Sequence, residues 1–361
     1  MKKMFQSAIM AFILLCGLQL TGCNPSEGNN PSISKTELWP AKGSNGKWGY
    51  INRKGIFVIQ PNFDYASIFS CEYAVVYMNG TQMYIDTEGK FQNSPVSSEA
   101  NDFCNNYAVI RENSRYGVID KNFKYVVQPI YYELGSIVAE NGLISFSYSS
   151  EEKYGFLDVK TGKVAIQPQY DYAYPFIGDY AVVSQNHKNG IINKNGEYVA
   201  QPIYESVYPL GDKLFVIADK NSSYTWYYGI MDEKGNIIVN LIYSDIPESI
   251  TTIGTVLPLG NLIAVENNSG KWGFIDHKGN EKIPFQYDHA RPFVEGYAVV
   301  TLNSRKMIID ESGDIVFMLD EGEYSEYDNG GVYGFINGLI LTNMNGSHRY
   351  RDLEGNIVYM W

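Results

Sequence analysis

Four histidines are the first residues of this 361-residue chain whose chemistry could support metal binding or acid–base catalysis. No two of them stand at the short spacings that bring a pair of imidazoles to one metal ion. We expect all four to be solvated loop residues: His187, His277, His289 and His348. The sequence therefore predicts no metal site and no histidine-based catalytic centre.

Other catalytic patterns are missing too. The chain has no Gly-x-Ser-x-Gly elbow, no phosphate-cradling loop and no nucleophile–base pair. We therefore predict that it is not an enzyme and that it binds no cofactor. A pair of glycosidase carboxylates stays open as an alternative, because sequence alone does not show which acids converge in space.

Recurring Asp-x-x-Gly segments raise the question of calcium. A calcium loop needs several convergent acids, and the positions inside these segments are often Lys or Asn. The one acid-rich copy is Asp310-Glu311-Ser312-Gly313-Asp314. Because the Asx side chain and the glycine are those of a tight hairpin turn, we interpret the segments as turns.

The four cysteines fall into two pairs. Cys16 and Cys23 lie near the N-terminus, whereas Cys71 and Cys104 precede similar Tyr-Ala-Val segments farther along. Equivalent sites of neighbouring repeats usually lie beyond the Cα separation of about 7 Å that a disulfide tolerates. We expect Cys71 and Cys104 to be buried or half-buried free thiols, with a disulfide between them as the alternative.

The N-terminal segment predicts export. A basic Met1-Lys2-Lys3 precedes an apolar stretch, residues 4–20, that carries no charge, as in a secretory signal. Leu20-Thr21-Gly22-Cys23 resembles the lipobox of bacterial lipoproteins. The resemblance implies that residues 1–22 are removed and that Cys23 is acylated, which would anchor the protein to a membrane.

Residues 23–35 are almost entirely polar and predict a flexible tether behind the anchor. Asn24 stands where some bacteria place an Asp that retains lipoproteins in the inner membrane, so its identity favours the outer membrane. Which side of that membrane the protein faces stays open.

Composition narrows the remaining classes. The net charge is −12, and loss of Lys2 and Lys3 with the signal would make it −14. Because an acidic chain repels phosphate backbones, we predict no nucleic-acid partner. Aromatic residues make up 14 % of the chain, and 34 Gly with 14 Pro supply turns, which favours an all-β fold.

A repeat occupies residues 36–361. Nine copies of one motif close with an Asp or Asn, and consecutive copies are 34 to 44 residues apart. A second run, such as Val58-Ile59-Gln60-Pro61, follows the motif, and a third, such as Tyr73-Ala74-Val75-Val76, follows the second in all units but the last. The clearest first motifs contain these pairs: Trp48-Gly49, Tyr116-Gly117, Tyr154-Gly155 and Trp272-Gly273.

This pattern resembles the WG-repeat family, which occurs in many bacterial secreted and surface proteins. We expect the aromatic–Gly pairs to lie in the core, because most aromatic residues recur once per unit. Each unit predicts three short antiparallel strands, with the first two joined by the Asx–Gly turn and the second ended by its proline.

Neighbouring units must stack to bury their faces. Residues 36–39 precede the first unit as an extra strand, and the chain stops at Trp361 without a third run. We therefore predict a closed, β-propeller-like ring whose last unit is completed by the N-terminal strand. An open β-superhelix is the alternative.

These features predict a non-enzymatic, surface or periplasm-facing lipoprotein that serves as a binding scaffold. A carbohydrate-binding accessory protein or a carbohydrate-active enzyme is the alternative, so the partner is a protein or a glycan. Insertions in repeats map to loops of the functional face. The longer intervals contain the candidate binding residues Tyr224, Trp226, Tyr227 and Tyr324.

Overall fold

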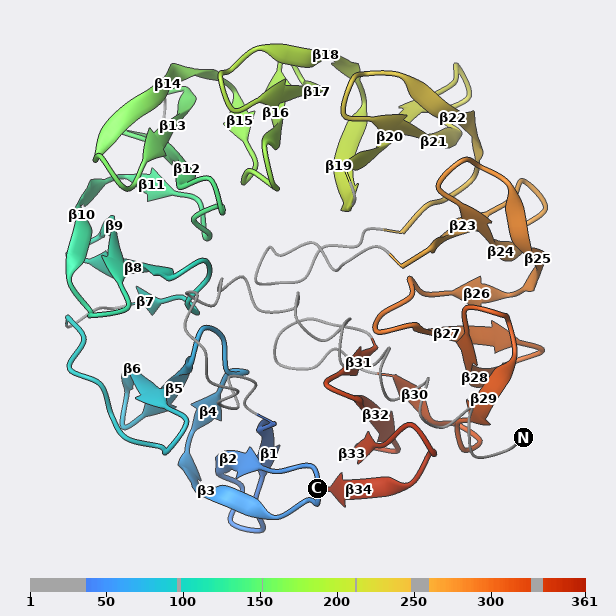
Figure 1. Cartoon of the computed structure of the whole chain (residues 1–361), viewed down its shortest axis with the longest axis horizontal. Helices are drawn as coiled ribbons and strands as arrows, with labels where there is room; N and C mark the ends of the chain where they lie inside the picture. Colours follow the sequence, from blue (N-terminus) through green and yellow to red (C-terminus); the bar gives the residue numbers. More distant parts are fainter. Residues whose placement is uncertain (1–36, 96–98, 151, 212, 248–259, 326–333) are drawn as a thin grey trace, which may run out of the picture.

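The computed structural model describes residues 37–95, 99–150, 152–211, 213–247, 260–325 and 334–361. These residues form strands and turns without a helix, and the strands build nine small antiparallel sheets arranged in a ring (Figure 1). The fold is a nine-bladed β-propeller. The prediction of an all-β closed ring is confirmed, and the open superhelix is wrong.

Each sheet is one blade, and we number the blades in chain order. Blades one to three contain β1 (Trp39–Lys42), β2 (Trp48–Ile51) and β3 (Phe57–Phe63); β4 (Tyr65–Ala66), β5 (Tyr73–Met78) and β6 (Thr81–Asp86); β7 (Glu99–Ala100), β8 (Tyr107–Glu112), β9 (Arg115–Asp120) and β10 (Tyr125–Tyr131). Blades four to six contain β11 (Glu133–Leu134), β12 (Leu143–Ser147), β13 (Tyr154–Asp158) and β14 (Lys163–Tyr170); β15 (Tyr172–Ala173), β16 (Tyr180–Gln185), β17 (Lys188–Asn193) and β18 (Tyr198–Tyr204); β19 (Ser206–Gly211), β20 (Leu214–Lys220), β21 (Trp226–Asp232) and β22 (Ile237–Tyr243). Blades seven to nine contain β23 (Leu262–Glu266), β24 (Trp272–Asp276) and β25 (Glu281–Tyr287); β26 (His289–Ala290), β27 (Tyr297–Leu302), β28 (Arg305–Asp310) and β29 (Ile315–Met318); β30 (Tyr324–Ser325), β31 (Phe335–Ile336), β32 (Leu339–Met344), β33 (Ser347–Arg351) and β34 (Ile357–Met360).

Within a complete blade such as blade five, the strand order is β15-β16-β17-β18. The short first strand lies nearest the centre of the ring and the fourth strand lies on its outer wall (Figure 1). The third strand of this blade contains Asn189-Gly190 in the place of the aromatic–Gly pair, and the fourth strand contains the run Val199-Ala200-Gln201-Pro202. Sequence order and radial order therefore agree from the centre outwards.

A two-residue hairpin turn joins the second and third strands of most blades. In blade three the turn is Asn113–Ser114, with φ of 47° and 63°, and β8 pairs with β9 directly across it. Positive φ at both positions is the geometry that matches the twist of paired strands, and Asn adopts it readily. Each blade thus combines the third run of one repeat with the first two runs of the next.

This pairing corrects the predicted closure. The N-terminal strand β1 pairs with β2 of its own blade, Trp39 opposite Ile51, and the described strands of blade nine all come from residues 324–360. The reason is local: the third run is already paired across its hairpin turn, so the last blade has no vacant position for β1. The ring closes without strand exchange.

The Asx–Gly turn joins the third and fourth strands, as expected. Asn52 Oδ1 accepts hydrogen bonds from the amides of Lys54 and Ile56, and Gly55 has a φ of +73°. In blade three, Phe123 occupies the place of the glycine and still adopts a φ of +59°. Its ring packs against Tyr73, Tyr84 and Phe103, which holds the strained backbone in place.

The Gln-Pro run explains why glycine follows the aromatic residue. A Cβ at Gly49 would lie 2.5 Å from the carbonyl oxygen of Ile59 and 2.8 Å from the backbone of Pro61. Tyr50 of β2 pairs with Ile59 of β3, and Trp48 pairs with Phe63. One residue of β2, Gly49, therefore faces three residues of β3, which bulge over it. The proline lies within the strand instead of ending it, which corrects that expectation, and β3 continues to Phe63.

The hydrophobic core lies between blades rather than at one centre. Tyr50 of blade one packs against Phe69 of blade two, with ring centroids 4.6 Å apart. The seam between blades nine and one is built in the same way, since Trp39, Ile51 and Tyr350 belong to one buried cluster. Ring closure therefore depends on side-chain packing.

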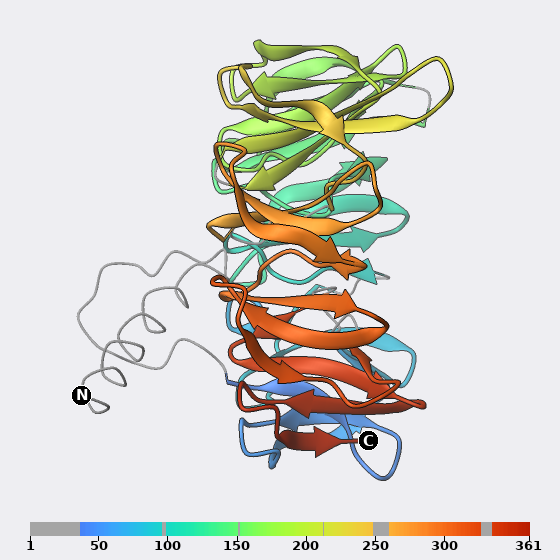
Figure 2. The ribbon, with the colours of Figure 1, turned by 90° about the vertical axis from the view of Figure 1, so that its right-hand side faces the viewer.

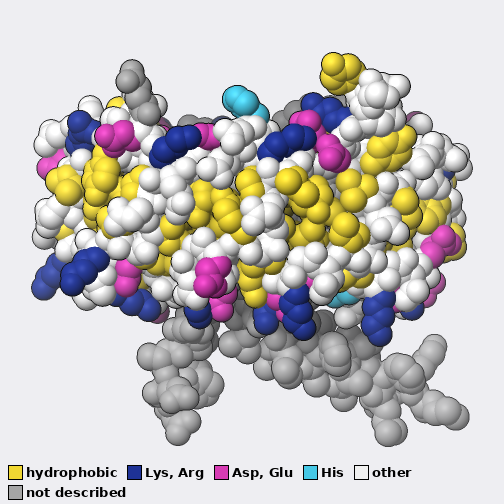
Figure 3. All heavy atoms as spheres, turned by 90° about the horizontal axis from the view of Figure 1, so that it is seen from above, with side chains coloured by type: hydrophobic (Ala, Val, Ile, Leu, Met, Phe, Trp, Pro, Cys, Tyr) yellow, Lys and Arg dark blue, Asp and Glu magenta, His cyan; other side chains and the backbone are white. Residues whose placement is uncertain are grey.

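The outer wall of the ring carries the exposed aliphatic residues. Ile130, Ile203 and Ile242 are each at least half exposed, and they lie on the outermost strands β10, β18 and β22. A view of the wall shows apolar side chains between two rims where charged side chains gather (Figure 3).

Candidate functional site

Strand direction divides the disc into two faces. The hairpin face carries the turns between second and third strands, and the Asx-turn face carries the turns between third and fourth strands. In blade one, whose described strands do not include a short first strand, these are the turns between β1 and β2 and between β2 and β3. The described chain enters β1 at Trp39, opposite Ile51 and next to the first Asx turn, whereas Lys42 lies beside the first hairpin turn. Figure 2 shows β1 beginning at one edge of the disc and β34 pointing toward the other.

Exposed tyrosines mark the hairpin face. Of the eight that the structure exposes, seven adjoin hairpin turns or the strand ends beside them: Tyr65, Tyr77, Tyr132, Tyr148, Tyr172, Tyr224 and Tyr324. The eighth, Tyr174, lies two residues along the inner wall and packs against Tyr172, with centroids 4.8 Å apart. Large amphipathic rings of this kind favour intermolecular contacts.

Lys–Asp clasps brace the same face between adjacent blades. Lys271 of blade seven donates to Asp288 at 2.7 Å, and the other carboxylate oxygen of Asp288 accepts from the amide of Asn303 in the hairpin turn of blade eight. The same three-part clasp recurs twice, in Lys47–Asp64–Asn79 and Lys153–Asp171–Asn186. The lysine hydrogen bond lowers the pKa of each aspartate.

A tyrosine cluster in blades four and five departs from this scheme. Tyr132-Glu133 reverses the order of acid and aromatic residue that Asp171-Tyr172 has in blade five. Glu133 therefore begins the inner strand β11 at the position where Tyr172 begins β15. The hydroxyl of Tyr154 donates to Oε2 of Glu133 at 2.5 Å, and the Tyr154 ring lies 5.0 Å from that of Tyr172. We call Tyr132, Glu133, Tyr154, Tyr172 and Tyr174 the Glu133 cluster.

The predicted binding residues divide between two places. Tyr224, which is 81 % exposed, lies in the turn between β20 and β21, and Trp226 and Tyr227 follow in β21. The Trp226 ring stacks on Tyr228, and the Lys220 ammonium lies 5.0 Å from its centroid. Tyr324 lies in blade nine, beneath Lys306, so the structure does not bring it to the other three.

The aromatic–Gly pairs expected in the core are buried to different degrees. Trp272 is 5 % exposed, whereas the rings of Trp48, Tyr116 and Tyr154 are half-buried at the hairpin face. The paired glycines, which lie under the bulged strands, are all buried: Gly49, Gly117, Gly155 and Gly273.

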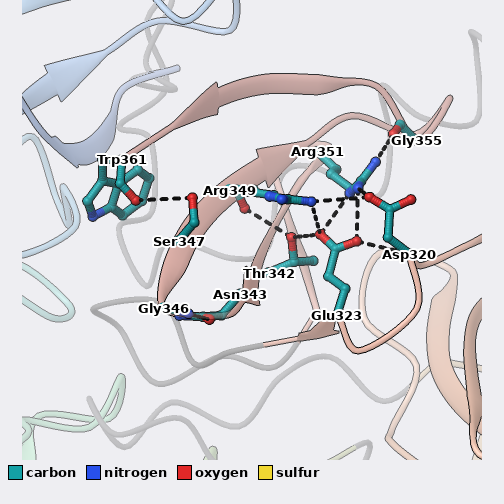
Figure 4. A network of polar contacts seen from close by, with 10 residues as sticks. All are labelled: Asp320, Glu323, Thr342, Asn343, Gly346, Ser347, Arg349, Arg351, Gly355 and Trp361. Atoms are coloured by element: carbon teal, nitrogen blue, oxygen red, sulfur yellow. Dashed lines mark hydrogen bonds and ion pairs between the residues drawn. The ribbon is translucent and has the colours of Figure 1, made fainter.

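Blade nine contains a buried ionic network that its sequence did not suggest (Figure 4). Arg351 occupies the place of a core isoleucine and donates to both carboxylate oxygens of Glu323, at 2.9 and 2.8 Å. Asp320 accepts from Arg351 and Arg349. Burial raises the pKa of Glu323, but hydrogen bonds from Arg351 and Thr342 outweigh it and leave that pKa below its usual value.

The cysteines follow the prediction in part. Cys104 is a buried free thiol, and burial raises its pKa to about 11. Cys71 is buried as well and is not bonded to Cys104, so the alternative of a disulfide between these two cysteines is wrong. Cys23 and the tether lie outside the described residues.

The expectation of solvated loop histidines is wrong for His289 and His348, which lie in strands. His289 in β26 packs against Trp272, and His348 in β33 stacks on Trp361, while His187 is exposed in its turn. Across the described residues, no group of three or more His, Cys, Asp or Glu side chains is placed to hold a metal ion. The same part of the chain contains no helix long and apolar enough to cross a membrane.

Comparison with solved structures gives distant likenesses at low identity. A crystal structure of a eukaryotic initiation factor has 8 % identity and a TM-score of 0.46, covering 80 % of this chain and 94 % of that one. BamB from Moraxella catarrhalis has 10 % identity and a TM-score of 0.39, covering 73 % and 87 %. The dihydro-heme d1 dehydrogenase NirN in complex with DHE has 13 % identity and a TM-score of 0.43, covering 80 % and 72 %.

No curated protein sequence matches the chain. A family of repeats, described as the WG containing repeat, matches six segments that together make up more than half of it: residues 48–81, 116–147, 154–188, 190–221, 228–249 and 272–305. The matched segments begin at or just after the start of a third strand, where the aromatic–Gly pair meets the bulged fourth strand. The chain therefore belongs to the WG-containing repeat family.

Proposed function

We propose that this protein is a lipid-anchored, non-enzymatic scaffold of the bacterial cell envelope that binds a protein partner on its hairpin face. One observation carries the proposal: the exposed tyrosines gather on that face, while the described chain enters the ring on the opposite one. Tyrosine supplies a large, rigid contact area at low entropic cost, which suits a binding surface.

The anchor would orient this surface. If Cys23 is acylated, residues 24–35 form a polar tether that spans at most about 40 Å when extended. Because the chain enters on the Asx-turn face, the hairpin face would point away from the membrane. Several acyl chains on one residue hold a protein stably, whereas a single chain binds reversibly. Asn24 favours the outer membrane as the destination.

The chemistry of the hairpin face supports binding rather than catalysis. The carboxylates beside the exposed rings already have partners in the chain, since Asp171 binds Lys153 and Glu133 accepts from Tyr154. Such pairs brace a surface and give it a fixed pattern of donors and acceptors. A general acid would instead need a proton poised above a reaction site.

Glycan binding is the second candidate, and the stacked pair Trp226–Tyr228 favours it. Their rings lie 6.2 Å apart at 30°, and Tyr224 extends the aromatic surface toward solvent at the tip of the hairpin. A carbohydrate-binding accessory protein would use such rings to stack sugars.

Site-specific photo-crosslinking in the native cell tests the proposal. Benzoylphenylalanine placed at Tyr172 or Tyr224 on the hairpin face should yield protein adducts. The same probe at Lys160 or Lys234 in the Asx turns provides the matched control and should yield none. Adducts from the Asx turns alone would contradict the proposal, and adducts with polysaccharide would favour the second candidate.

A further inference from the structure

We propose that the Glu133 cluster binds a lysine or arginine side chain presented by the protein partner. This inference rests on the proposed function and names the chemistry of the partner. Four observations carry it: an acid released from the Lys–Asp clasp, a carboxylate oxygen held in place, exposed rings beside it, and chain cations on similar rings of the same face.

The acid is released because acid and aromatic residue exchange places. In blades two, five and eight the acid follows the outer strand and binds a lysine, as Asp171 binds Lys153. At the corresponding place before blade four stands Tyr132, and Arg115 lies over its ring at 5.8 Å instead of pairing with an acid. Glu133, one residue later, is therefore free of the lysine that the clasp would supply.

A neutral group holds Glu133 instead. The Tyr154 hydroxyl donates to Oε2, and within the described residues nothing donates to Oε1. Hydrogen bonding to a phenol fixes the carboxylate without cancelling its charge. A charged donor from a partner would therefore form a strong, charge-assisted hydrogen bond there.

The rings beside this carboxylate are suited to cations. Tyr172 and Tyr174 are 43 % and 45 % exposed, and their centroids lie 4.8 Å apart at 72°. Burial is the main cause that raises the pKa of Tyr154 and of Tyr172; the hydrogen bond to Glu133 raises that of Tyr154 further, and Tyr174 and then Glu133 raise that of Tyr172 further. Both phenols are therefore protonated at neutral pH. The negative faces of aromatic rings attract ammonium and guanidinium groups.

Chain cations already occupy equivalent rings on this face. Lys42 lies 5.2 Å from the Trp48 centroid, and Arg111 lies 5.2 Å from that of Tyr116 while pairing with Glu99. In the neighbouring blade, the guanidinium of Arg111 thus contacts both a glutamate and a tyrosine ring. Glu133 and the tyrosines around it present the same combination of groups. The overall charge of −12 adds long-range attraction for a basic partner.

Calorimetric titration of the full mature protein with two short peptides tests this site. One peptide contains two arginines among glycines, and the other contains citrulline in their place. We expect the arginine peptide to bind more tightly, and its affinity to fall as salt is raised. Glu133→Gln keeps an acceptor for Tyr154 and should weaken binding about tenfold. Tyr172→Leu should weaken it several-fold.

Glu99→Gln is the matched control, because Arg111 already occupies that carboxylate. It should leave the peptide affinity unchanged. Equal affinity for both peptides, no binding at millimolar concentration, or an unchanged affinity in Glu133→Gln would overturn the cation site. In each of these cases, crosslinks from Tyr172 in the cell would still support the scaffold, and their loss would contradict it separately.

Discussion

Trp39 and Ile336 are 297 residues apart in the sequence, and the indole nitrogen of Trp39 donates a hydrogen bond to the carbonyl oxygen of Ile336 at 3.1 Å. The bond crosses the seam where the first blade meets the last. Tyr350 and Tyr359 of blade nine add two more, to the carbonyls of Pro40 and Lys42. These side chains take the place of an exchanged strand.

Truncating Trp39 should open this seam. Trp39 is 4 % exposed, so Trp39→Ala should lower the free energy of unfolding by about 3–5 kcal/mol, the usual range for a buried aromatic residue. Hydrogen exchange should become faster in β32 and β33, which pack against it. Urea unfolding and exchange mass spectrometry measure the two effects.

Trp272→Ala provides the control for the seam. Trp272 is 5 % exposed and lies between blades seven and eight, so its loss should cost a similar amount. It should leave exchange in β33 unchanged except through global unfolding. If Trp39→Ala destabilises the protein but does not affect β32 and β33, the seam does not depend on the contacts described.

The bulged fourth strand should reject any side chain at the paired glycine. In Gly155→Ala the new Cβ would lie 2.5 Å from the carbonyl oxygen of Ile166 and 2.7 Å from the nitrogen of Pro168. We expect a loss of about 1–3 kcal/mol, the range for overpacking, measured by urea unfolding. Gly162→Ala has open space around its Cβ and tests the left-handed backbone alone, at about 1 kcal/mol. Equal losses would refute the steric explanation.

Phe123 should behave differently from the glycines in its position. Its φ is +59°, so Phe123→Ala loses the aromatic packing and keeps the backbone strain. Phe123→Gly loses the same packing and relieves the strain, and it should be more stable than the alanine variant by about 1 kcal/mol. Thermal unfolding of the two variants decides this, and the opposite order would mean that the strain is absent.

The Lys–Asp clasps predict a loss of stability in acid. Hydrogen bonds from Lys47, Lys153 and Lys271 hold the pKa values of Asp64, Asp171 and Asp288 below the ordinary 3.8. In the unfolded chain these aspartates bind protons more readily, because their pKa values are not lowered there. The clasps therefore stabilise the fold above about pH 3.8 and lose their effect as the pH falls through the lowered pKa values.

Thermal midpoints between about pH 6 and pH 3 measure this dependence. The triple variant Asp64→Asn, Asp171→Asn and Asp288→Asn should be less stable near neutral pH, and its midpoint should fall less steeply in acid. High salt should reduce the difference, because the pairs are solvent-exposed. A triple variant with the same pH profile as the parent would show that other carboxylates control it.

Acylation at Cys23 predicts a specific thiol count. In the processed protein Cys16 is removed and Cys23 is a thioether, so reduction and denaturation should expose two thiols, Cys71 and Cys104. Cys23→Ser should abolish acyl labelling and leave an unprocessed chain with three, including Cys16. Equal labelling and membrane retention in that variant would contradict a lipoprotein.

The parts of the fold that follow from local chemistry were predictable. The Asx–Gly turns recur in the sequence, and Asn52 forms the predicted hydrogen bonds. Repetition also implied that blades share their cores, and the cluster of Tyr50 and Phe69 has this form. Closure was predictable because a stack of nine similar units must either curve into a ring or expose two apolar ends.

The predicted pairing of runs is wrong, although the sequence carries a signal for the pairing that the structure shows. Asn79-Gly80 and Asn345-Gly346 are hairpin dipeptides, and they join each third run to the next first motif. Reading them as turns would have placed β1 in blade one. The bulge at Pro61 was not predictable in the same way, because it depends on the space that Gly49 leaves on a neighbouring strand.

The candidate site could not be read from the long loops alone. Tyr224 and Tyr324 were both suggested by insertions, yet they lie in blades six and nine. The signal for the Glu133 cluster is the reversed order Tyr132-Glu133, which has meaning only when the register of neighbouring repeats is known. Convergence of Tyr154 and Tyr172 on that carboxylate is a property of the ring.

A ring without an exchanged strand has consequences for how such proteins change over generations. Every blade is encoded by one uninterrupted stretch of chain, and each junction between blades uses the same kind of side-chain contact. Duplication or deletion of a gene segment can therefore add or remove a whole blade while both ends still meet. Families built in this way can gain or lose one blade at a time. In an interlocked ring the first and last segments share a sheet, so the same change would require a new way of closing the ring.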